Sequence, residues 1–131
     1  MNSKEMTIIL LSPILGFLAF LIPEIFGSSI NVKYIFNASF IQAIYESMIP
    51  IPTLSLLIII GIILGFISPR LWFLSGVLTL SIFPIVAFCE MITNPTSHNL
   101  WPIEFILYFV FTIPAIGGAY IGNRVKNLMN T

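Results

Sequence analysis

The segment from Ile51 to Arg70 reads IPTLSLLIIIGIILGFISPR, and it indicates the architecture more directly than any other part of the chain. Its first part, residues 51–67, is apolar on every side and carries no charged residue. Strands of membrane barrels alternate apolar and polar residues, so this run predicts a helix that satisfies its own backbone hydrogen bonds in lipid. The short link Ser68-Pro69-Arg70 then predicts a tight antiparallel hairpin with the helix that follows.

Apolar runs on both sides of this segment extend the same pattern to four predicted membrane spans. A bilayer core about 30 Å thick requires about 20 apolar residues in a helix. Prolines lie inside three of the runs, at Pro13, Pro84 and Pro114, and we expect kinks there. The four predicted spans cover about residues 7–26, 51–67, 71–92 and 102–122.

The composition excludes most other classes of protein. The chain has 131 residues, of which 58% are hydrophobic, and it contains 5 basic and 5 acidic residues. A soluble domain of this size would carry about 33 charged residues at the usual 25%. Disorder requires low hydrophobicity and high charge, and nucleic-acid binding requires basic runs that this neutral chain lacks. We therefore expect one integral membrane domain over residues 1–131, an all-α four-helix bundle.

The first predicted span and the segment that follows it each have a distinctive sequence pattern. Lys4 precedes the first apolar run as in a signal peptide, but the run exceeds a usual h-region of about 7–15 residues. We therefore expect an uncleaved first span. Between the first and second spans, residues 38–48 place apolar side chains at spacings of three and four. This spacing predicts an amphipathic helix lying at the membrane interface.

The distribution of charge predicts the orientation. Positively charged residues concentrate in cytoplasmic loops, and with four spans only Lys33 falls on the outer side. We therefore expect a plasma (inner) membrane protein with both termini in the cytoplasm. The basic residues expected on the cytoplasmic side are Lys4, Arg70, Arg124 and Lys126.

Small residues mark the faces on which the helices are expected to pack. Gly61 and Gly65 lie four positions apart on the second span, and Gly118 and Gly122 do so on the fourth. Such spacing lets two membrane helices approach closely. Two interpretations stay open, because the same motif serves packing within one bundle and a seam between two copies of the chain.

Glu90, His98 and Glu104 are the candidate functional residues. Glu90 lies in the last turn of the third predicted span, where the helix dipole disfavours a carboxylate, whereas Glu104 lies in the favourable first turn of the fourth. His98 lies on the polar link between them. Two neighbouring carboxylates can share a proton or hold a cation, and a histidine adds a ligand that zinc or manganese accepts. The sequence specifies no particular metal and no cofactor.

Hydroxyl side chains in the third span have a structural explanation. Ser75, Thr79 and Ser81 have no base nearby in the sequence. We expect them to donate hydrogen bonds to carbonyls of their own helix or to a neighbouring helix. The single cysteine, Cys89, lies in an apolar run and is expected to behave as a small hydrophobe.

Three functional hypotheses follow from these observations. The sequence favours a non-enzymatic accessory, assembly or regulatory protein of the membrane, because the centres of the predicted spans carry no charge. Its partners would be the lipid bilayer and either a second copy or other membrane subunits. The first alternative is a small proton- or cation-linked transporter or channel that uses Glu90. The second is an interfacial membrane enzyme that uses Glu90, His98 and Glu104 as acid, base or metal ligands.

Overall fold

Helices are the regular structure throughout the parts of the chain that the computed structural model describes, which are residues 3–26, 51–93 and 101–130. No strand occurs within these ranges. The expected interfacial helix at 38–48 lies outside them. The elements are α1 (Ser3–Phe26), α4 (Ile51–Ile67), the 3₁₀ helix η1 (Pro69–Leu71), α5 (Trp72–Leu78), α6 (Ile82–Thr93) and α7 (Trp101–Met129).

Three helical segments are long and apolar enough to cross a membrane. They cover Ser3–Pro23, Pro69–Thr93 and Phe105–Met129. A fourth helix, α4, is equally apolar but has 17 residues. The apolar composition of these segments is compatible with a membrane protein.

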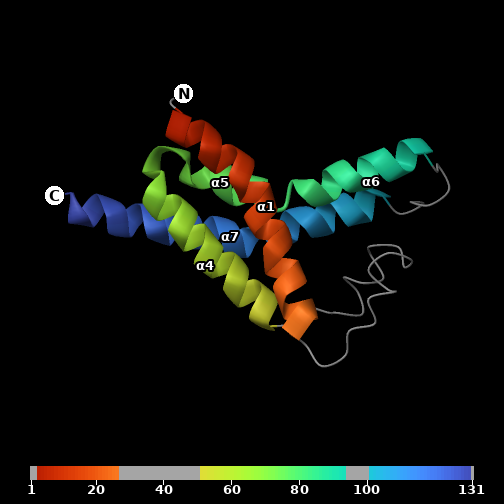
Figure 1. Ribbon diagram of the computed structural model, residues 1–131, viewed down its shortest axis with the longest axis horizontal. Coiled ribbons are helices and arrows are strands. Elements are labelled where there is room, and N and C mark those ends of the chain that lie inside the picture. The colour runs from red at the N-terminus through yellow and green to blue at the C-terminus, as the bar shows by residue number, and fades with distance from the viewer. Residues whose placement is uncertain (1–2, 27–50, 94–100, 131) are drawn as a thin grey trace.

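A tight turn connects α4 to α5. The backbone N–H of Ser68 donates to the Leu64 carbonyl at 3.0 Å, and the N–H of Leu71 donates to the Ser68 carbonyl at 3.1 Å. Pro69 begins the intervening η1, a position where its missing N–H removes no helical hydrogen bond. The turn reverses the chain and lays α5 against α7 (Figure 1).

The closest helix pair is formed by α4 and α7, whose backbones touch. A Cβ built on Gly61 would overlap the carbonyl oxygen of Ala115, and one built on Gly118 would overlap the carbonyl oxygen of Ile58. Gly65 and Gly122 meet the facing backbone in the same way. Residue numbers rise together along the two helices, so α4 and α7 run parallel. We call this contact the glycine seam.

The third apolar segment is divided, which differs from the continuous helix expected over 71–92. Residues 79–81 form a turn between α5 and α6, three residues before Pro84. A proline cannot donate to the carbonyl four residues earlier, and here that carbonyl belongs to Leu80. The N–H of Phe83 donates to it instead, at 3.2 Å, so the chain bends where only a kink was expected.

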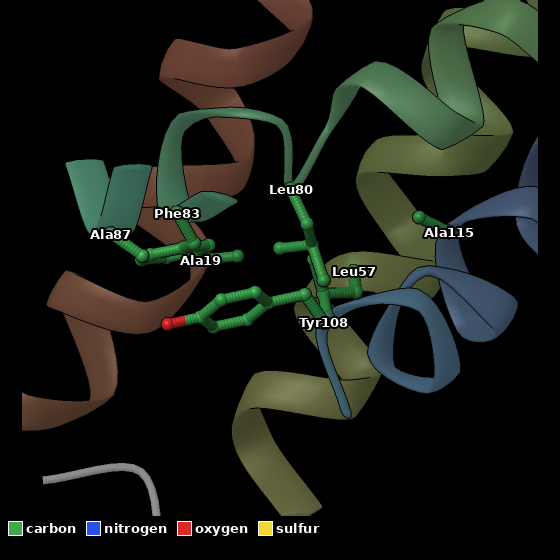
Figure 2. Packing of buried hydrophobic residues seen from close by; sticks show 7 residues of the cluster. All are labelled: Ala19, Leu57, Leu80, Phe83, Ala87, Tyr108 and Ala115. Carbon is green, nitrogen blue, oxygen red and sulfur yellow. The ribbon is translucent and has the colours of Figure 1, made fainter. Parts of the chain in front are cut away.

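An aromatic cluster fills the space around this break. The Phe83 ring lies 5.0 Å from the Phe20 ring in an edge-to-face arrangement, and it stacks on Tyr108 at 6.1 Å. Leu57 and Leu80 are fully buried in the same cluster. Figure 2 shows Leu80 descending from the bend toward Leu57, with the Tyr108 side chain beneath Phe83.

The helices divide the molecule into a packed end and an extended end. The start of α1, the α4–α5 turn and the last turns of α7 lie toward one end (Figure 1). At the other end, α6 and the first part of α7 extend past α4, and α6 makes few contacts with the remaining helices. We call this extension the α6–α7 arm.

Candidate functional site

The three candidate residues all belong to the α6–α7 arm or to the link between its helices. The backbone of Glu90 lies in the last turns of α6, and the backbone of Glu104 lies in the first turn of α7. Their side chains and the whole of His98 are outside the described residues. The proposal that these three side chains meet therefore stays a prediction.

Contacts on the described part of the arm fix the relative level of the two glutamates. Phe83 stacks on Tyr108, and α6 leaves this contact in the direction from which α7 arrives. Glu90 lies about two turns beyond Phe83, and Glu104 lies about one turn before Tyr108. With straight helices, the two Cα atoms differ in level by about 5 Å along the arm, at 1.5 Å per residue.

Metal-ligating side chains do not gather elsewhere in the described ranges. No group of three His, Cys, Asp or Glu side chains that could hold a metal ion occurs among these residues. Cys89 carries a free, exposed thiol on α6.

Six bonds from buried or half-buried hydroxyl groups run to carbonyls three or four residues earlier in the chain. Ser12 donates to Ile8 at 2.7 Å in α1, and Thr112 donates to Phe109 at 2.6 Å in α7. In the third segment, Ser75 donates to Trp72, Thr79 to Ser75 and Gly76, and Ser81 to Leu78. The expectation for Ser75, Thr79 and Ser81 is confirmed.

Hydrogen bonds also occupy the carbonyls around the α5–α6 break. The Gly76 oxygen accepts from the N–H and the hydroxyl of Thr79, and the Leu78 oxygen accepts from the N–H and the hydroxyl of Ser81. Helix α1 lies directly on the break, because a Cβ built on Gly16 would overlap the Thr79 carbonyl oxygen. Hydrogen bonds within the chain and the contact with α1 therefore occupy the backbone groups of the break, and we call it a closed break.

Basic and aromatic side chains gather at the opposite, packed end. Trp72 meets Tyr120 edge to face at 5.4 Å, and the Tyr120 hydroxyl accepts a hydrogen bond from Arg124 Nε at 2.9 Å. Lys126 Nζ lies 4.9 Å from the centre of the Phe66 ring. These contacts join the α4–α5 turn to the last turns of α7.

In the sequence alone, the cations of the packed end indicate only the orientation of the chain, and this cluster is not predicted. The contact between Tyr120 and Arg124 could have been predicted from their spacing, because residues four apart are neighbours on a helix. Trp72 also lies two residues after Arg70, the last residue of the hairpin link. What the sequence lacked was the pairing of α5 with α7, which brings the two segments together.

No known protein family, no curated protein and no solved structure matches this chain.

Proposed function

We propose that the chain is a four-span protein of the plasma membrane with both termini in the cytoplasm. The directions of the packed helices support this topology. Spans that alternate in direction make the second and fourth parallel and the third antiparallel to both. The glycine seam joins α4 and α7 in parallel, and the contacts of Trp72 with Tyr120 and of Gly76 with Ile116 join α5 and α7 antiparallel.

Within that topology, the protein serves as a non-enzymatic accessory or assembly subunit. The observation that supports this most is the closed α5–α6 break, where the bend's own N–H groups and hydroxyls occupy the Gly76 and Leu78 carbonyls. Polar groups inside the bundle therefore stabilise its shape. The α6–α7 arm extends from the packed helices, α6 makes few contacts with the rest of the bundle, and we assign partner recognition to this arm.

The arm carries large exposed side chains that a partner helix can contact. Ile106 is 62% exposed and Phe109 is 64% exposed, both on the first part of α7. Ile59 on α4 has a comparable exposure of 51% but lies outside the arm. The three positions are therefore matched in apolar character and differ in location.

Site-specific photocrosslinking in native membranes tests this assignment. The full chain would carry a photoreactive phenylalanine analogue at Ile106 or Phe109, with the same analogue at Ile59 as the control. We expect one discrete protein adduct from both arm positions and only lipid adducts from the control. Lipid adducts alone at all three positions, with the protein purifying as a single species, would contradict a subunit role.

A cation- or proton-linked transporter is the second candidate, because the third apolar segment is discontinuous at residues 79–81, although the occupied carbonyls there favour the subunit role. Transporters often bind their ions at discontinuous helices. The test is cation or proton flux in proteoliposomes containing the full chain, compared with Glu90→Gln. Flux that the substitution abolishes would establish transport, whereas absence of flux from the unmodified protein would remove this candidate.

A further inference from the structure

One end of the molecule combines three cations with three aromatic rings on adjoining elements. Phe66 lies in the last turn of α4, Arg70 lies in η1 and Trp72 begins α5, and α7 supplies the others. The aromatic contacts described above join α4 and α5 to α7, and η1, which carries Arg70, packs against α7. We call it the basic collar, and it consists of Phe66, Arg70, Trp72, Tyr120, Arg124 and Lys126.

Aromatic rings contact two of the three cations of the collar, Arg124 and Lys126. The guanidinium of Arg124 lies 5.3 Å from the centre of the Tyr120 ring while Nε donates to the Tyr120 hydroxyl. Arginine has five N–H donors in a planar fork, and this bond uses one of them. Arg70 and Arg124 are both exposed, so their remaining donors face the surroundings.

The charge at this end favours an anion. Arg70, Arg124 and Lys126 contribute three positive charges to the collar. Among the described residues, the acid toward this end of the molecule is Glu5, in the first turn of α1 beside Lys4. Glu90 and Glu104 lie on the arm at the opposite end (Figure 1).

Exposed apolar side chains lie beside the collar. Phe73 is 56% exposed and packs its ring edge to face against Trp72 at 5.7 Å. Ile121, next to Tyr120 on α7, is 48% exposed. A ligand held by the collar would therefore meet both positive charge and hydrocarbon-binding surface.

We propose that the basic collar binds the phosphate headgroup of an anionic phospholipid, with the acyl chains lying against Phe73 and Ile121. Arginine forks match the oxygens of a phosphate, and aromatic side chains favour the level at which headgroups meet the hydrocarbon core. The collar also lies at the end that the topology assigns to the cytoplasm, where anionic lipids are enriched. This inference rests on the proposed membrane topology.

Tryptophan quenching by brominated lipid provides the test. Trp101→Phe leaves Trp72 as the single tryptophan of the chain, which has two. The full chain is reconstituted in phosphatidylcholine vesicles with a minor fraction of phosphatidylglycerol, with bromine on either one lipid or the other. We expect quenching by brominated phosphatidylglycerol well above its share of the lipid, with a selectivity of about fivefold for each cation that engages it.

Charge-matched variants separate a collar from diffuse attraction. Arg70→Gln and Arg124→Gln should each lower the phosphatidylglycerol selectivity about fivefold, while Lys4→Gln removes the same charge outside the collar and should preserve it. Arg124→Lys keeps the charge without the fork and should give an intermediate loss, which retains a readout if the glutamine variants fail to fold.

The failures of this proposal and of the membrane topology are distinguishable. Equal quenching by both lipids in the parent protein would overturn the collar and leave the topology intact. An equal loss of selectivity in Lys4→Gln would also overturn it, because the attraction would then belong to the whole end. Absence of quenching by either lipid would overturn the membrane placement itself.

Discussion

Gly117 and Gly118 are neighbours in sequence with opposite surroundings. A Cβ built on Gly118 would overlap the backbone of Ile58 in α4, whereas one on Gly117 would meet nothing within 4 Å. The requirement for glycine at position 118 is therefore a requirement for space, since both residues lie in the same continuous helix. The contacts that Gly118 makes lie within one chain, which favours the intramolecular interpretation of the glycine motif over a seam between copies.

Gly118→Ala should destabilise the protein by about 1–3 kcal/mol, the usual cost of forcing extra volume into a packed contact. Gly117→Ala is the matched control and should be neutral or stabilising by up to about 1 kcal/mol, because alanine favours helix more than glycine does. Thermal unfolding in detergent, followed by circular dichroism, measures both. Equal melting temperatures for the two variants would contradict the glycine seam.

The Thr79 hydroxyl should contribute to stability because it is fully buried and bonded to two carbonyls. Thr79→Val keeps the shape and removes the donor, and we expect a loss of about 1 kcal/mol. Thr7→Val removes a similar bond, from Thr7 to the Ser3 carbonyl at 3.0 Å, at an exposed site and should change stability less. The same unfolding assay compares them, and a larger effect at Thr7 would argue against the closed break.

At the level of the helices, Pro84 accompanies a break whereas Pro114 lies in a continuous helix, and the neighbouring residues and contacts explain the difference. Before Pro84, the chain has Gly76, Thr79 and Ser81, residues of modest or low helix propensity. After Pro114, α7 packs its backbone onto α4 through the glycine seam, and the helix continues. The sequence predicts kinks at both prolines. It cannot distinguish them, because the periodicity of apolar residues contains no information on which turns a neighbouring helix supports.

Pro84→Ala should extend α6 toward α5. The new N–H at residue 84 can donate to the Leu80 carbonyl, which now accepts from Phe83. We expect slower hydrogen exchange at the backbone amides of residues 80–85, measured by mass spectrometry. Pro114→Ala in the continuous α7 is the control and should change exchange less. Unchanged exchange at 80–85 would show that the contact with Gly16, and not the proline, maintains the bend.

At the scale of the whole molecule, the sequence predicted the helical class and the residues at which helices touch. Apolarity over nearly 20 residues suffices for a helix, and α4 covers the expected 51–67. The candidate acids are different, because no periodicity determines where their side chains lie, and the convergence of the two acids stays a prediction. The basic collar escaped prediction for a related reason, since it arises from pairing between segments almost 50 positions apart in the sequence, Trp72 and Tyr120.

The two termini should be accessible from the same side of the membrane, because the helix directions fit four alternating spans. In a Cys89→Ser background, Lys4→Cys and Leu128→Cys should both react with an impermeant maleimide from the cytoplasmic side only. Thr96→Cys, in the link between α6 and α7, is the control and should react from the outer side. Reaction of residues 4 and 128 from opposite sides would contradict the four-span topology.

The glycine seam also sets an order of events during synthesis. Its two halves, α4 and α7, are separated in sequence by α5 and α6, so the ribosome must add 62 more residues after Ile67 before Met129 completes the second half. At usual elongation rates this interval lasts roughly 3–12 s. During this interval, the face of α4 that carries Gly61 and Gly65 is not covered by α7. Nascent chains stalled before α7 should therefore be the form that chaperones and quality-control proteases engage.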